Sequence, residues 1–214
     1  MIFEISSVAL ESEPAEIKYL KFIDALSMYG GDWRIDKNFF PKLDFGEDST
    51  AIIELKNLPQ KGVKFTLFFR YRNFLDDHHS SDDRVYIEFG SKINEYGGLV
   101  NKTFEYYITG FNAYFAQISP ESLLYEDFEI SRNKNYRKFI PRFYPIMFIS
   151  SVMCNEVFHV TLDMFAEVVS KHVEKVWKFN DGIAYIYSSI PPTVEECNEF
   201  NIKIKNEIKK VQIV

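Results

Sequence analysis

A run of charged and imidazole side chains at residues 76–83 is the densest concentration of possible metal ligands in the chain. It supplies four carboxylates and two imidazoles, from Asp76, Asp77, His78, His79, Asp82 and Asp83. These ligand types bind divalent metals, but ligands that are adjacent on a polar loop have nothing to impose a coordination geometry. We therefore expect no metal and no cofactor. The alternatives are a solvated loop and an exposed acidic surface that binds a partner through Asp76, Asp77, Asp82 and Asp83.

A second group of residues could in principle carry nucleophilic catalysis. Asp163 follows His159 at helical i, i+4 spacing, and Cys154 lies five residues before His159. No third residue that would orient the base is identifiable, and no glycine-rich oxyanion loop accompanies the group. A cysteine in an apolar strand is usually inert. We expect no catalytic residue here, and we interpret His172, on an apolar helical stripe, as structural.

Two further features are candidates for partner binding. Asp44, Glu47 and Asp48 form a second acidic segment, and Trp33 follows Gly-Gly-Asp in a predicted loop. An indole ring in such a place either caps the core or anchors an interface. We include Trp33, Asp44, Glu47 and Asp48 among the predicted partner-binding residues.

Composition and charge bound the class of protein. The chain has 214 residues, 46% of them hydrophobic and 17% aromatic, so it can bury a core. Two cysteines are too few for a disulfide framework, and the first ten residues lack a basic segment and carry Glu4. We expect a cytoplasmic protein without a membrane span. The oligomeric state does not follow from the sequence.

The net charge of −6 argues against nucleic acid as the main partner, because binding to phosphates depends on lysine and arginine. One segment, residues 132–139, interleaves basic and aromatic residues in the way that single-strand binding sites do. Its alternative is a solvated connection before a strand. The glycine pairs at 30–31 and 97–98 lack the further glycines or the lysine of a nucleotide-binding loop.

The apolar periodicity predicts a single α+β domain over residues 1–214, since no linker or repeat divides it. Strands are expected at 2–10, 50–58, 64–73 and 84–89, the last three as an antiparallel meander. A helix opens near Pro14, with a broad buried face, and ends before Gly30. The residues expected on that buried face are Ile17, Leu20, Phe22, Ile23 and Leu26.

The second half is expected to alternate helices and strands. Residues 104–118 predict a helix that ends near Pro120, and a short helix follows. The apolar run at 144–153 predicts a strand buried on both faces, with a buried helix segment as the alternative that periodicity leaves open. A helix is predicted at 162–176 and a strand at 182–188. Thr193 and Glu196 predict a capping box for the last helix. The predicted order is β-α-β-β-β-α-α-β-α-β-α, with about five helices on a mixed or largely antiparallel sheet.

Read in order, the helix that ends in Tyr-Gly-Gly-Asp-Trp at 29–33, the meander, the aromatic helix with Phe-Asn-Ala-Tyr-Phe at 111–115 and the final strand and helix resemble immunity protein family 52 of bacterial polymorphic-toxin systems. The likeness departs from the family where a Gly-Trp is expected, since Phe-Tyr-Pro stands at 143–145. The resemblance implies a protein without catalysis that binds and neutralises one cognate toxin. The alternatives are a small intracellular enzyme with a dispersed active site and a nucleic-acid or regulatory adaptor.

Overall fold

The computed structural model describes residues 1–29, 33–48, 50–55, 58, 61–75, 82–90 and 93–212. The chain divides into two compact units, residues 2–113 and 114–214.

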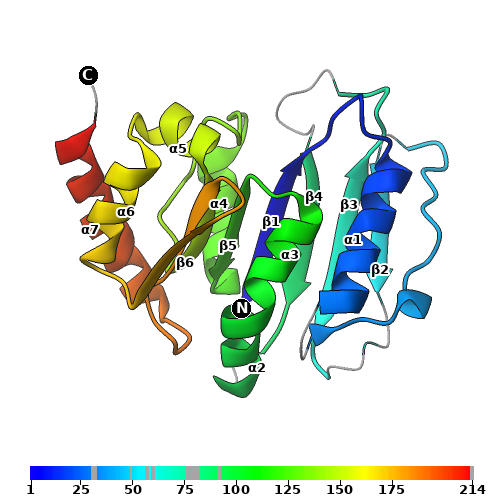
Figure 1. Cartoon of the computed structure of the whole chain (residues 1–214), viewed down its shortest axis with the longest axis horizontal. Helices are drawn as coiled ribbons and strands as arrows, with labels where there is room; N and C mark the ends of the chain where they lie inside the picture. The colour runs from blue at the N-terminus through cyan, green and yellow to red at the C-terminus, as the bar shows by residue number, and fades with distance from the viewer. Residues whose placement is uncertain are drawn as a thin grey trace. The chain divides into compact units, whose positions relative to one another are not determined.

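The first unit contains four antiparallel strands in the order β2-β3-β4-β1 (Figure 1). They are β1 (Ile2–Val8), β2 (Thr50–Leu55), β3 (Lys64–Arg70) and β4 (Asp82–Glu88). Alternate residues of β2, β3 and β4 are buried, as a strand with one covered face requires. The register aligns Phe3, Ile87, Phe65 and Leu55 in one row across the strands. This row lies on the buried face.

Helices α1 (Ala15–Tyr29) and α3 (Phe104–Phe111) lie side by side on that buried face (Figure 1). A short 3-10 turn, η2 (Lys37–Phe39), follows α1, and α2 (Ile93–Gly98) leads through a π-helical segment, η3 (Leu99–Thr103), into α3. The two long helices approach closely at Gly110, where an added Cβ would come within 2.4 Å of the Ala25 side chain. Only a glycine allows this packing.

Aromatic rings fill the space between α1, α3 and the strands. Phe111 is fully buried, with its ring centroid 4.8 Å from that of Phe22 and 5.8 Å from that of Phe69. Phe3 stacks on Phe104 at 5.1 Å. The burial of Phe104 and Phe111 confirms the predicted core face of the helix that carries them.

The second unit contains four antiparallel strands in the order β5-β6-β8-β7. They are β5 (Phe115–Ser119), β6 (Ile146–Ser150), β7 (Lys175–Phe179) and β8 (Gly182–Ile186). Every residue of β5 and β8 is buried. Asn180 and Asp181 have positive φ angles of 47° and 51°, which suit the tight turn between β7 and β8.

The helices of this unit are α4 (Glu121–Ser131), α5 (Ser151–Phe158), α6 (Leu162–Ser170) and α7 (Val194–Val211). The predicted capping box at the start of α7 is confirmed. The Thr193 hydroxyl accepts from the backbone N–H of Glu196, and the Glu196 carboxylate accepts from the backbone N–H of Thr193. The core joins α5, α6 and α7 to β6 and β8 through side chains that include Phe158, Phe165, Phe200, Ile149 and Tyr185.

The α+β class with antiparallel strands is confirmed, although the described residues hold seven α-helices rather than about five. The predicted helix at 104–118 is wrong beyond Phe111. Asn112 adopts a left-handed conformation with φ 51° and ends α3, and residues 115–119 then pair with β6 as a strand. The apolar spacing of 104–118 fits a helix but does not reveal this break.

Two further predicted elements are each split. The strand expected at 144–153 ends at Ser150, whose side chain caps α5 by accepting from the backbone N–H of Met153. The helix expected at 162–176 ends at Ser170, and Val176 belongs to β7. Within the described residues, no helix is long and apolar enough to cross a membrane.

Candidate partner-binding site

Asp83, which was expected on an exposed acidic loop, is buried in the structure. Its side chain has 0% exposure and lies in β4. Arg72 donates to both carboxylate oxygens at 2.9 Å, Lys18 donates to Oδ2 at 2.8 Å, and the Arg70 backbone N–H donates to Oδ1 at 2.9 Å. The expectation of an exposed loop is therefore wrong for Asp83, because buried cations surround its carboxylate.

Lys18 and Arg72 each make further interactions besides those with Asp83. Lys18 also donates to the Val8 carbonyl at 2.8 Å and lies 5.2 Å from the Phe111 ring centroid. Arg72 also donates to the carbonyl of Glu13 at 2.8 Å. Burial lowers the pKa of Lys18, and the charge of Asp83 opposes that shift. This cluster fastens the start of α1 to β4, so it is structural.

The other residues of the predicted acidic loop fall into two groups. Asp82 is also buried, so the exposed loop is wrong at this position too. Asp76, Asp77, His78 and His79 lie outside the described residues. In the part of the chain that the structure does describe, no three His, Cys, Asp or Glu side chains are grouped as metal ligands.

Trp33 caps the core instead of lying at the surface. Its side chain is buried, its ring meets the ring of Phe89 edge-on at 5.5 Å, and its carbonyl accepts from the Tyr107 hydroxyl at 2.7 Å. This packing fits the role of a cap on the core, which was one of the two roles expected for the indole. Almost none of the ring reaches solvent, so Trp33 offers little surface to a partner, and its part in partner binding stays a prediction.

The cysteine and histidine residues of the second unit that were candidates for catalysis, Cys154 and His159, show no activated arrangement. Cys154 lies inside α5, where burial raises the pKa of its thiol to about 12. His159 ends α5 in a left-handed conformation and is exposed, and Asp163 forms an ion pair with Lys178. A thiol that holds its proton so strongly is a poor nucleophile. His172 is half-buried, and burial lowers its pKa.

The acidic segment at residues 44–48 is exposed and locally ordered. The Asp44 carboxylate accepts from the Gly46 backbone N–H at 2.9 Å, and the Asp48 N–H donates to the Phe45 carbonyl at 3.1 Å. Gly46 has a φ of 55°, which favours glycine. The side chains of Asp44, Glu47 and Asp48 are exposed. Among the predicted partner-binding residues that the structure describes, these three have the accessibility that the prediction needs.

Three aromatic rings lie beside this acidic segment, and we call them the aromatic cluster. The Phe45 and Tyr71 ring centroids are 4.9 Å apart, and those of Tyr71 and Phe74 are 5.9 Å apart. Phe74 is 51% exposed and Tyr71 is 39% exposed. Arg70 holds the turn after β3 by donating to the Phe74 carbonyl at 3.0 Å. Exposed aromatic rings held by a strand end are typical anchors of protein interfaces.

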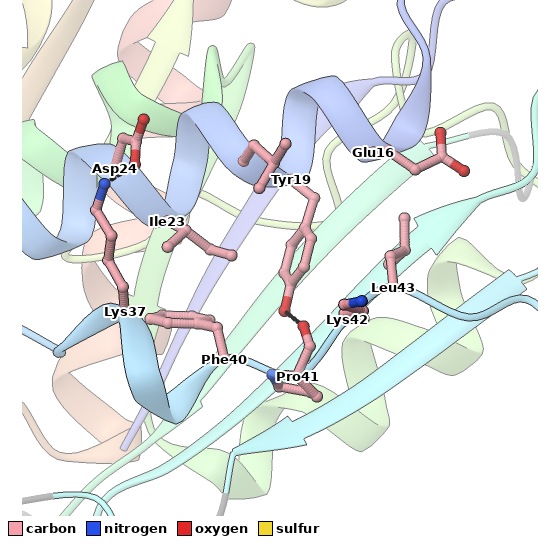
Figure 2. A pocket seen from close by; sticks show the side chains of 10 residues that line it. Glu16, Tyr19, Ile23, Asp24, Lys37, Phe40, Pro41, Lys42 and Leu43 are labelled. Atoms are coloured by element: carbon pink, nitrogen blue, oxygen red, sulfur yellow. Dashed lines mark hydrogen bonds and ion pairs between the residues drawn. The ribbon is translucent and has the colours of Figure 1, made fainter.

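A groove between α1 and the chain at residues 37–43 adjoins the acidic segment, and we call it the α1 groove (Figure 2). Its volume is about 450 Å³. Figure 2 shows the Tyr19 hydroxyl directed at the Pro41 carbonyl, to which it donates at 2.6 Å, and Lys37 reaching Asp24 at 2.5 Å. Burial raises the pKa of Tyr19 to about 12.

The groove was not predicted from the sequence, because the whole apolar set of α1 was expected in the core. Ile17 is 46% exposed and Leu20 is 55% exposed, so their expected burial is wrong. Phe22, Ile23 and Leu26 are buried as expected. Apolar side chains at 17, 20, 22, 23 and 26 cover more of a helix than one packed face requires, and that excess was the available signal.

A comparison with solved structures gives a likeness of fold, whereas two other comparisons find nothing. No protein-family model matches the chain, and no curated protein matches it. The structure of the Pseudomonas aeruginosa T6SS protein PA0821 matches with a TM-score of 0.58 at 8% identity, over 99% of this chain and 72% of that one. At this identity the likeness shows the fold alone. Membership of immunity protein family 52 stays a prediction.

Proposed function

We propose that this chain is a non-catalytic, cytoplasmic immunity protein that binds a cognate bacterial toxin and neutralises it. The observation that carries the proposal is the exposed surface of the first unit, where the carboxylates of Asp44, Glu47 and Asp48 lie beside the aromatic cluster. Aromatic anchors supply affinity, and charges at the rim supply association rate and specificity. A surface of this kind suits a partner with basic side chains.

The fold likeness to a protein named for T6SS supports the same class of role. Burial raises the pKa of the Cys154 thiol to about 12, which argues against Cys154 as a catalytic nucleophile. A toxin with a positively charged substrate groove, such as a nuclease, would place cations opposite Asp44, Glu47 and Asp48. The chain would then occupy the place of the substrate phosphates.

Co-purification with the product of the neighbouring reading frame tests the proposal. The informative variant changes Asp44→Asn, Glu47→Gln and Asp48→Asn together. The matched control removes three exposed carboxylates of the second unit, with Glu129→Gln, Glu195→Gln and Glu199→Gln. We expect the first variant to slow association by about tenfold at low salt, because rim charges act mainly on encounter. The control should bind like the wild type.

Two outcomes would contradict the proposal. One is a neighbouring product that does not bind the wild-type chain at all. The other is reproducible turnover of a substrate by the purified chain that is lost in Cys154→Ala or His159→Ala variants that still fold.

A further inference from the structure

We propose that the α1 groove is an anchor pocket for one bulky aliphatic or aromatic side chain of the partner, carried on a segment with lysine or arginine beside it. This inference rests on the proposed function, since it names the chemistry of the partner at the same surface. It is argued from the lining of the groove, the contacts that join its walls and its charge.

The lining of the groove is mostly apolar. Tyr19, Ile23, Phe40, Pro41 and Leu43 form its walls, and Leu20 lies on its α1 side. Pockets that hold ligands or anchor side chains have volumes of roughly 300–1,000 Å³, and this groove has about 450 Å³. More than half of the Leu20 side-chain surface remains exposed, at 55%. Covering such surface with an apolar side chain removes it from water and is favourable.

Contacts within the chain join the walls of the groove without any partner. The Tyr19 ring meets the Phe69 ring edge-on at 5.4 Å, and its hydroxyl holds the Pro41 carbonyl at 2.6 Å. The ion pair between Asp24 and Lys37 joins the two walls farther along. A pocket whose walls are already tied together loses little conformational entropy on binding, which favours its use as an anchor site.

The charges around the groove select the sequence context of the anchor. A second hollow, of about 510 Å³, shares Pro41 and Lys42 with the groove and extends to Asp44 and Glu54. Together the two hollows are lined by four acids, Glu16, Asp24, Asp44 and Glu54, and by two lysines, Lys37 and Lys42. Lys37 and Asp24 form an ion pair that neutralises both charges. Three acids and one lysine remain, so the rim carries a net negative charge. Cationic residues beside the anchor complement that rim.

The test uses defined peptides, so it does not depend on knowing the toxin. Capped tetrapeptides of sequence lysine-leucine-phenylalanine-lysine and glutamate-leucine-phenylalanine-glutamate are titrated to millimolar concentration into the ¹⁵N-labelled full chain. We expect the basic peptide to shift amide resonances of residues 16–24 and 37–43 and to bind about tenfold more tightly than the acidic one. Equal binding of both peptides, shifts confined to other residues, or no shifts would overturn the inference.

Leu20→Lys replaces the exposed apolar side chain by a cation and should weaken the basic peptide at least tenfold. Lys at this position is four residues after Glu16 on the helix, so α1 should still form. The matched control is Ile202→Lys in α7, where the isoleucine is 61% exposed; it should bind the peptide like the wild type. A wild-type dimer that Leu20→Lys dissociates would instead show that a second copy of the chain occupies the groove.

Toxin binding by the wild type and by the Leu20→Lys variant, together with the peptide titration, separates failure of this inference from failure of the proposed function. If the toxin binds the wild type and the Leu20→Lys variant equally well, the anchor pocket is wrong and the immunity function stands. If the peptides bind as expected but the neighbouring product does not bind, the groove chemistry stands and the proposed function is wrong.

Discussion

Each unit contains a buried charged cluster among its described residues, and these two clusters are built in opposite ways. In the first unit one carboxylate, Asp83, is held by two cations, Lys18 and Arg72. In the second unit one cation, Arg142, is held by the Asp127 carboxylate at 2.6 Å and by the Asn198 side-chain oxygen at 2.6 Å.

The difference lies in what each cluster keeps when its acid is removed. Without Asp83, two cations remain close together, with Lys18 buried and Arg72 nearly so. Without Asp127, Arg142 keeps Asn198 and the partly exposed Glu126 carboxylate at 3.3 Å. Burial raises the pKa of Asp127, and the hydrogen bonds and charge of Arg142 oppose that shift. The first cluster therefore depends on its acid far more than the second does.

The largest effect is expected for Asp83→Asn. Breaking a buried ion pair leaves uncompensated charge, so the free energy of unfolding should fall by about 3–5 kcal/mol. Glu88→Gln is the matched control, because Glu88 is in the same strand and its ion pair with Lys64 is exposed; it should cost less than about 1 kcal/mol. Urea unfolding measures both. If the two variants lose the same free energy of unfolding, the burial of Asp83 does not make it more important to stability than the exposed Glu88.

Asp127→Asn should cost less, about 1.5–3 kcal/mol, since it removes hydrogen bonds to a charged group whose other partners remain. Its control is Asp163→Asn, where the ion pair with Lys178 is exposed and the change should be within about 0.5 kcal/mol. If Asp127→Asn destabilises the chain as much as Asp83→Asn does, the proposed contrast between the clusters is wrong.

The two tryptophans test whether the chain unfolds as one cooperative domain, as its lack of a linker predicts. Trp33 is in the first unit and Trp177 in the second, and the chain has two tryptophans in all. In a Trp33→Phe background, fluorescence reports on the second unit alone. Adding Asp83→Asn should then lower the urea midpoint reported by Trp177. A midpoint that stays unchanged would show two independently folding domains.

The last prediction concerns chemical labelling of the two cysteine thiols, which should stay unlabelled as long as the chain is folded. Burial raises the pKa of both Cys154 and Cys197 to about 12, from an ordinary value of 9.0. The ionised fraction of each thiol is therefore about a thousandfold lower in the folded chain than in the unfolded chain. In the folded chain this fraction becomes large only as the pH approaches 12. At pH 8 neither thiol should react with iodoacetamide until urea unfolds the chain. Rapid labelling of folded Cys154 would favour the enzyme alternative.

Features that depend on nearby residues could be predicted from the sequence. The capping box of Thr193 and Glu196 involves residues three apart, and the meander of β2, β3 and β4 follows from alternating apolar residues and local turns. The turn at Asn180 and Asp181, followed by Gly182, is also a local hairpin signal. This signal marks the end of β7, whose first two residues fall within the helix expected at 162–176.

Features that depend on distant residues could not be predicted. Lys18 is 65 residues from Asp83, and nothing in the run at 76–83 indicates that a lysine of α1 neutralises its last acid. The exposure of Leu20 likewise depends on how much of α1 the strands cover, which periodicity does not give. An acidic run in a sequence is therefore weak evidence for an acidic surface, whereas Asp44, Glu47 and Asp48 have the exposure that such a surface needs.

The most direct test of the proposed neutralisation is a titration of toxin activity with the purified chain. The toxin is the product of the neighbouring reading frame, held at a concentration well above the dissociation constant. A stoichiometric inhibitor should reduce activity linearly with added chain and abolish it near one equivalent, independent of incubation time. Complete inactivation by a small fraction of an equivalent that deepens with time would show catalysis, and activity that persists in excess chain would show that the toxin is not its partner.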